Sequence, residues 1–247
     1  MSADTQPRPI WKLVLWAVAA ALAFAGLVAL GTWQVHRRSW KLDLIARVDQ
    51  RVHAPPVAPP PRSQWPHVDA EHDEYLHVCA DGELLKADET LVKAVTRLGP
   101  GDWVLTPLRT AAGDILLINR GFVDAAHRSA ASHAQPSGNV QICGLLRISE
   151  PHGAFLHHND PATNRWYSRD VAAIAAARKL PTTDVAPYFI DADATPNPGG
   201  WPVGGLTVIR FHNSHLVYAI TWYALALMVL GGAWVVGRHE WRGRRGA

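Results

Sequence analysis

His215 stands directly before the second of two long apolar segments in this sequence. If that segment is helical, Tyr218 and Trp222 follow on the same face as His215, together with Ala219 and Ala226. An imidazole with aromatic side chains one and two turns further along could bind the iron of a haem that lies against the helix. The same residue types are also common where a membrane helix meets water. The pattern therefore leaves two interpretations, a haem ligand or an interfacial aromatic belt.

Other polar clusters offer weaker chemistry. His157 and His158 are adjacent, and adjacent side chains of an extended segment point to opposite sides, which favours a polar loop over a metal site. Arg120 follows an apolar segment and could bind a carboxylate, but a structural ion pair is the simpler explanation. His212 shares the helical face of His215 only if the helix begins early.

No set of residues predicts an enzyme. The sequence contains no G-x-S-x-G motif, phosphate-binding loop or dinucleotide fingerprint. Its two cysteines, Cys79 and Cys143, are too far apart for a C-x-x-C motif and too few for a copper carrier. A disulfide between them is possible in an oxidising compartment but is not predicted. The net charge of +3 gives no support to nucleic-acid binding.

Two segments are predicted to cross a membrane, residues 13–35 and 213–237. Neither Leu13–Val35 nor Leu216–Gly237 contains a charged side chain, and about 20 apolar residues suffice to cross the hydrocarbon core. The first segment is longer than the apolar part of a signal peptide and has tryptophans at its ends, which favours an uncleaved helix. The tail before it carries Asp4 and lacks the Arg- and Ser-rich character of a mitochondrial targeting peptide.

The arginines of the C-terminal tail decide the predicted orientation. Residues 238–247 contain four arginines, and such clusters stay in the cytoplasm. With two spans, residues 1–12 must lie on the same side. Basic residues between Arg37 and Lys41 argue locally for the opposite orientation, but long domains are translocated largely regardless of charge. We therefore predict a bacterial inner-membrane protein with both termini in the cytoplasm.

The elements between the spans are predicted to form a periplasmic domain. Residues 36–62 form a helical extension followed by a proline-rich linker. Residues 63–212 contain short β-rich segments separated by Gly- and Pro-containing turns, which predicts a mostly β domain closed as a barrel or a sandwich. One packed helix is expected in residues 168–180, with Ser168 as its N-cap. The predicted fold class is α+β, with two transmembrane helices flanking this domain.

A ridge of alanines runs along the first predicted helix. Ala17, Ala21, Ala25 and Ala29 recur at intervals of four, and small side chains allow helices to approach closely in lipid. We expect this ridge to face the second helix or a helix of a partner protein.

Five blocks of the sequence, spread over nearly the whole chain, together resemble a known family. They are LGTWQVHRRSWKLDLI, GDWVLTPLRTAAGDILLINRGFV, GLLRISEPHGAFLHHNDPATNRWYSRD, NPGGWPVGG and NSHLVYAITWYALAL. In this order, and between two terminal helices, they are similar to the surfeit locus protein one family. Members of that family are assembly factors for haem a-containing cytochrome c oxidase in bacteria and mitochondria.

The resemblance implies that this protein binds haem a and assists its insertion into the catalytic subunit of the oxidase. The family's haem-associated histidine lies in an N-N-H-L-x-Y-A-x-T-W motif, and His215 occupies that position, with Ser214 in place of the second asparagine. His215 is then the expected ligand of the haem iron, and Tyr218 and Trp222 are expected to contact the haem. The expected partners are the catalytic subunit, the bilayer and an enzyme of haem a biosynthesis.

Two other functions remain open at this point. One is a membrane scaffold that stabilises an oxidase subunit without holding haem. The other, more distant, is a membrane-anchored periplasmic enzyme.

The predicted orientation can be tested with a reporter enzyme that is active only outside the cytoplasm. We expect activity from a fusion near Gly138, in the domain between the spans, and none from a fusion after Ala247. An active C-terminal fusion would show that the four arginines do not set the orientation.

Overall fold

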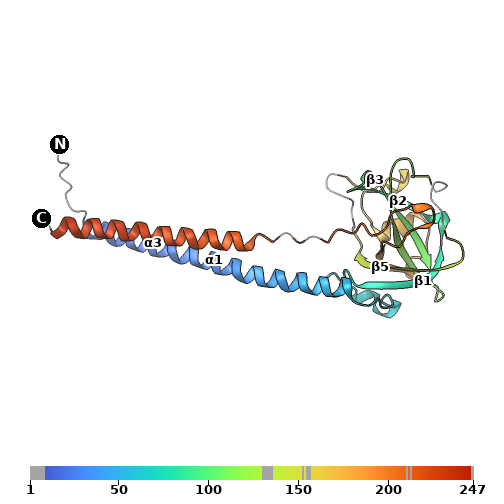
Figure 1. The fold of residues 1–247 in the computed structure, drawn as a ribbon, viewed down its shortest axis with the longest axis horizontal. Helices are drawn as coiled ribbons and strands as arrows, with labels where there is room; N and C mark the ends of the chain where they lie inside the picture. Colours follow the sequence, from blue (N-terminus) through green and yellow to red (C-terminus); the bar gives the residue numbers. More distant parts are fainter. Residues whose placement is uncertain are drawn as a thin grey trace. The chain divides into compact units, whose positions relative to one another are not determined.

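The computed structural model describes residues 9–129, 136–151, 153, 157–209, 211 and 213–245. The chain forms two compact units, one of Met1–Ala46 with Arg210–Ala247 and the other of Arg47–Ile209. The first unit, called here the helix pair, holds α3 (His215–Arg245) and α1 (Ile10–His53) as far as Ala46. The second unit, the β-domain, holds the last turns of α1 and all the strands (Figure 1).

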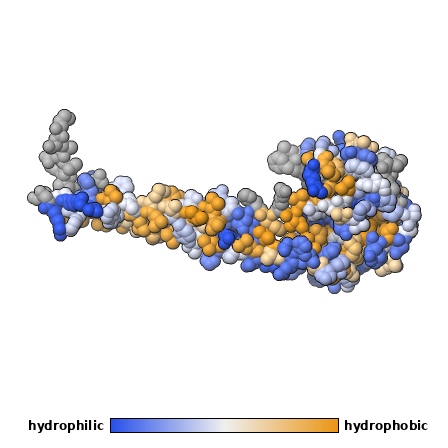
Figure 2. All heavy atoms as spheres, in the orientation of Figure 1, coloured by the Kyte–Doolittle hydropathy of each residue, from blue (hydrophilic) through white to orange (hydrophobic). Residues whose placement is uncertain are grey.

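The helix pair consists of two helices that are long and apolar enough to cross a membrane. Figure 2 shows that their surface is largely hydrophobic and that the end of α3 is hydrophilic, where Arg242, Arg244 and Arg245 occupy the last turn. α1 has no break before His53, and the prolines that follow cannot continue the hydrogen-bond ladder. The expectation of two apolar terminal helices on either side of a mostly β domain is confirmed.

Most of the alanine ridge lies on the exposed side of α1. Ala21, Ala25 and Ala29 are exposed, whereas the side of α1 with Phe24 and Gly31 is buried or half-buried in the helix pair. These three alanines therefore do not meet α3, whereas Ala17 lines a groove with residues of α3. The alternative, that the ridge faces a helix of a partner protein, stays a prediction. Gly31 does lie against α3, where a Cβ would come within 2.8 Å of the ring of Tyr223.

The β-domain is a closed barrel with one additional strand. Its strands are β1 (His77–Leu84), β2 (Thr90–Thr96), β3 (Gly99–Arg109), β4 (Ile115–Val123), β5 (Asn139–Ile148) and β6 (Val185–Ala192). The strand order is β1-β5-β6-β4-β3-β2, and β1 also pairs with β3. That pairing closes five strands into a barrel and leaves β2 on the outside, so the barrel alternative holds and the sandwich does not. β4 and β6 are parallel, and the other pairs are antiparallel.

One apolar cluster fills the inside of the barrel, and a second covers one side of it. The inner cluster takes residues from all five barrel strands, including Val78, Leu108, Ile118 and Leu146. The outer cluster joins β2, β3, β4 and β6 to the short helix α2 (Val171–Ala177). Successive residues of β4 alternate between the clusters, and the strand is buried along its whole length.

The helix α2 begins later than the sequence suggested. Its N-cap is Asp170, whose carboxylate accepts a hydrogen bond from the Ala173 N–H. Ser168 is buried instead, where its hydroxyl donates to the Glu150 carbonyl at 2.7 Å and accepts from the Gly153 N–H at 3.0 Å. The prediction of Ser168 as the cap is wrong because this hydroxyl joins a loop, while a carboxylate lies next to the first helical residue.

Short 3₁₀-helices complete the β-domain: Arg62–His67, Lys86–Asp88, Pro161–Thr163, Thr182–Asp184 and Pro198–Gly200.

A β-bulge in β4 explains one of its glycines. Gly121 pairs with Val104 and Asn119 pairs with Leu105, so Arg120 is an extra residue in the ladder. Gly121 has a φ of 134°, and a Cβ there would overlap the backbone of Val203. That segment returns to β4 and exchanges two hydrogen bonds of 2.9 Å between Val203 and Phe122. Only glycine fits both the dihedral angle and the close approach.

We expect Gly121→Ala to lower the free energy of unfolding by about 2–3 kcal/mol, since a positive φ and a backbone overlap act together. Gly113→Ala is the matched control. Gly113 also has a positive φ, but a Cβ there meets nothing within 4 Å, so about 1 kcal/mol should be lost. Denaturant unfolding of the full chain, followed by circular dichroism, measures both. Equal losses would show that the contact with Val203 is unimportant.

Candidate functional site

His215 is the first residue of α3. The side chain of Asn213 accepts a hydrogen bond from the His215 N–H at 3.4 Å, and the Ser214 carbonyl accepts from the Tyr218 N–H at 3.3 Å. The side chain of Asn213 thus caps one free N–H group of the first turn, and the Ser214 carbonyl accepts the first hydrogen bond of the helix ladder.

The imidazole of His215 is held by α1. Its Nδ1 lies 2.7 Å from Oε1 of Gln34, and both side chains are half-buried. An amide oxygen can only accept a hydrogen bond, so Nδ1 carries a hydrogen, and in the neutral ring Nε2 then keeps its lone pair. Histidines that bind metals in proteins almost always show this arrangement, with the second ring nitrogen donating to an oxygen.

Tyr218 and Trp222, the other predicted site residues, differ in how far they are buried. Ala219 and Ala226 are each only 2% exposed, so the side of α3 that carries them faces α1. Trp222 lies between them and is half-buried, and its Nε1 is buried without a hydrogen-bond partner among the described residues. Tyr218 lies beside this side of the helix and is 52% exposed. The two aromatic side chains therefore differ, Trp222 being partly enclosed and Tyr218 open to the surroundings.

The two helices are also in contact at Gly31 and Tyr223. A Cβ on Gly31 would come within 2.8 Å of the Tyr223 ring. The Tyr223 hydroxyl lies 3.1 Å from Oγ1 of Thr32, which itself donates to the Val28 carbonyl at 2.9 Å. The tyrosine is therefore the donor to Thr32. Since Gly31 and Gln34 are three residues apart on α1, this contact and the one to His215 stabilise the same part of the helix pair.

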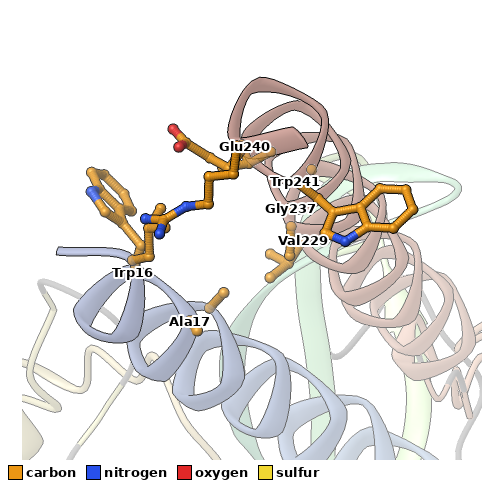
Figure 3. Close-up of a pocket in the computed structure, with 12 residues that line it drawn as sticks. Trp16, Ala17, Val229, Gly237, Glu240 and Trp241 are labelled. Carbon is orange, nitrogen blue, oxygen red and sulfur yellow. The ribbon is translucent and has the colours of Figure 1, made fainter. Parts of the chain in front are cut away.

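A groove of about 670 Å³ lies between the helices near the arginine-rich end of α3. Figure 3 shows Trp16 and Ala17 of α1 across from Val229, Gly237 and other residues of α3. Its lining is almost entirely apolar, except for Glu240 and Arg244. The nearest lining residue on α3, Val229, is roughly 20 Å along the helix from His215 at 1.5 Å per residue. The groove is thus separate from the histidine.

Asp191 is the centre of a buried polar cluster in the β-domain. Asp191 accepts hydrogen bonds from Asn119 at 2.7 Å, from Arg147 at 3.1 Å, from Arg169 at 3.0 Å and from Thr207 at 3.0 Å. Arg169 also binds Glu150 at 2.6 Å. Burial alone would lower the pKa of Arg169, but the charges of Asp191 and Glu150 outweigh it and raise that pKa above its usual value. The carboxylate of Asp191 is thus committed to hydrogen bonds and ion pairs within the domain.

The remaining candidates of the β-domain also have structural contacts. Arg120 is buried, donates to Oδ1 of Asn197 at 3.3 Å and lies 3.8 Å from Oε2 of Glu89. This contact agrees with the interpretation of a structural ion pair. The ring of His157 stacks on Tyr167 with centroids 4.8 Å apart.

No group of three or more His, Cys, Asp or Glu residues that could hold a metal ion occurs among the residues with described positions. His212 lies outside those residues.

A disulfide joins Cys79 and Cys143, which are directly opposite each other on β1 and β5. This disulfide could not be predicted from the sequence, because nothing in the spacing of the cysteines shows that the sheet pairs the two positions.

The comparison with known proteins gives the affiliation of the chain. The profile of the SURF1 family matches residues 21–227. The chain belongs to the SURF1 family. It is 38% identical to a SURF1-like protein of Monosiga brevicollis over 88% of this chain and 85% of that one. It is 34% identical to surfeit locus protein 1 of Homo sapiens, over 87% and 73% of the two chains, and 35% identical to that of Rattus norvegicus, over 79% and 67%. The match to the SURF1 family includes both partners of the hydrogen bond between Gln34 and His215.

Gln34 is the site residue that the sequence reasoning missed. A signal was available, since Gln34 carries the only side-chain amide between Leu13 and Val35. A polar side chain on an apolar helix usually has a partner or a function.

We expect Gly31→Leu to separate the two helices, because the added side chain would occupy the position of the Tyr223 ring. Gly26→Leu is the control, since a Cβ there meets nothing within 4 Å. Spin labels at Leu30→Cys and Ile220→Cys, both exposed positions, report the separation by pulsed electron paramagnetic resonance. A longer or broader distance distribution should appear only with Gly31→Leu. An unchanged distribution would mean that this contact does not hold the pair together.

Proposed function

We propose that the protein is an assembly factor for haem a-containing cytochrome c oxidase, which binds haem a through His215 and assists its insertion into the catalytic subunit. The observation that carries the proposal is the imidazole at the start of an apolar helix, with Nδ1 donating to Gln34 and Nε2 left to bind iron. Membership of the SURF1 family supports the assembly role.

The residues around His215 fit such a ligand. A neutral imidazole binds haem iron well, and the hydrogen bond to Gln34 keeps it in the required tautomer. Trp222, on the same side of α3, and Tyr218, beside it, provide aromatic surfaces next to the imidazole. Haem a when bound supplies a redox-active iron within a largely apolar macrocycle. An apolar helix pair favours such a ligand, because apolar surface is removed from water.

The location follows the same reasoning. We place α1 and α3 across the bacterial inner membrane, the β-domain in the periplasm and both termini in the cytoplasm. The arginines at the end of α3 support that orientation. The disulfide between Cys79 and Cys143 also supports it, since disulfides persist in oxidising compartments such as the periplasm and are rare in the cytoplasm.

The proposed partners are the catalytic subunit of the oxidase, the enzyme that makes haem a and the surrounding lipid. A role in assembly rather than catalysis fits the β-domain, where the buried carboxylate of Asp191 is committed to hydrogen bonds and ion pairs. His215 would hold haem a at the level of the membrane surface until the catalytic subunit receives it.

The test is the variant His215→Ala, produced together with the enzymes of haem a biosynthesis. The variant should still be inserted and abundant. Its affinity for haem a should fall by more than the roughly 10–100-fold that follows loss of a ligand's hydrogen-bond partner, because here the ligand itself is lost. Optical and pyridine-haemochrome spectra measure the haem content. In cells, the oxidase should have less haem a and low activity, while a quinol oxidase without haem a is unaffected.

His239→Ala is the matched control, because His239 is an exposed histidine of the same helix, close to its other end. It should keep the haem content and the Soret band of the wild type. If His215→Ala also kept both, the residue would be an ordinary interfacial histidine. A scaffold that stabilises an oxidase subunit without holding haem would then be the better assignment.

A further inference from the structure

The side chain of Gln34 has one described partner, the imidazole of His215, at 2.7 Å. The two residues come from different helices and are separated by most of the sequence, so the contact is formed by tertiary packing. From this geometry we infer that Gln34 is a positioning residue for His215, which selects the ring tautomer and the direction of Nε2. The inference rests on the proposed function, because it concerns how the ligand to haem a is prepared.

The side-chain carbonyl of Gln34 is positioned by the part of α1 that carries it. Gly31 lies three residues before it and faces the ring of Tyr223, and Thr32 receives the hydroxyl of Tyr223 at 3.1 Å. These contacts, together with the apolar packing around them, hold this part of α1 against α3. Oε1 of Gln34 therefore meets Nδ1 without large freedom of either side chain, since both are half-buried.

This hydrogen bond has a chemical consequence for His215. A free imidazole exchanges its hydrogen between Nδ1 and Nε2, and its ring can turn over about the Cβ–Cγ bond. With Nδ1 bound to a carbonyl, Nε2 keeps a lone pair and points away from Gln34. Loss of such a partner typically lowers metal affinity by about 10–100-fold.

The amide also determines the electron density on the ring. A neutral carbonyl is a weaker acceptor than a carboxylate, which would pull the Nδ1 hydrogen more strongly and make Nε2 a more electron-rich ligand. A richer ligand favours the oxidised iron and lowers its reduction potential. Glutamine also avoids a fixed charge at a position between two apolar helices.

The experiment compares three variants of the full chain in detergent: Gln34→Leu, Gln34→Glu and Thr32→Val. Purified haem a is the probe, and both its dissociation constant and the reduction potential of the complex are measured. Gln34→Leu should weaken binding by about 10–100-fold. Gln34→Glu keeps an acceptor for Nδ1, so it should restore the affinity and shift the reduction potential to a more negative value.

Thr32→Val is the matched control for packing. It removes a hydrogen bond between the same two helices, next to Gln34, but does not touch His215. Binding of haem a should stay within about twofold of the wild type, well below the loss expected for Gln34→Leu. If Thr32→Val lost as much affinity as Gln34→Leu, the amide would act only through the association of the helices, and the inference would be wrong.

Failure of the inference and failure of the proposed function give different results. If His215→Ala binds haem a as the wild type does, His215 is not the ligand and both fail. If His215→Ala loses haem a while Gln34→Leu keeps the wild-type affinity and reduction potential, the proposed function stands and only the role of Gln34 is refuted. Loss of affinity in Gln34→Leu, with recovery in Gln34→Glu, supports both.

Discussion

A polar side chain on an apolar helix must find its hydrogen-bond partner within the protein, and this constraint organises the helix pair. Gln34 and Thr32 are the polar aliphatic side chains of the apolar part of α1, and both meet polar atoms of α3. If the two helices lie in lipid, as proposed, apolar side chains contribute little to such an association, because lipid is as apolar as they are. Two hydrogen bonds and the absence of a side chain at Gly31 then help to hold the helices together. The candidate haem ligand is one of the bonded groups.

The same constraint acts differently in the β-domain. Closing the sheet through β1 and β3 buries both faces of β4, so the polar residues on that strand need partners inside the protein. Asn119 binds Asp191, and Arg120, displaced by the bulge, binds Asn197 and lies near Glu89. These hydrogen bonds and ion pairs join particular positions of the barrel to one another. With the other donors of the cluster, they also occupy both carboxylate oxygens of Asp191. The helix pair, in contrast, holds an imidazole with one ring nitrogen still available.

These two patterns connect the structure with the proposed function. An assembly factor that carries a redox cofactor needs to bind it without performing the chemistry of the finished oxidase. In our proposal, a single histidine at the start of an apolar helix provides this binding. An assembly factor must also release its cargo. A neutral hydrogen-bond acceptor such as Gln34 suits that task better than a charged one, because its hydrogen bond to the histidine is weaker.

The sequence by itself determined the two apolar helices, the mostly β character of the domain and the family. Uncharged segments of sufficient length, alternating β-rich runs and five motif blocks are local features, and local features can be read without a structure. His215 was found for the same reason, since its motif lies within ten consecutive residues. Its helix start is likewise local, because the side chain of Asn213 pairs with the N–H of the first helical residue.

Only the tertiary structure decided which residues meet across the chain. It selected a barrel instead of a sandwich through the pairing of β1 with β3, and it placed Cys79 opposite Cys143. It left Ala21, Ala25 and Ala29 of the alanine ridge exposed and moved the cap of α2 from Ser168 to Asp170. It brought Gln34 to His215. Such contacts depend on register and on the rotation of a helix about its axis, and both are fixed by close packing and hydrogen bonds between segments that are distant in sequence.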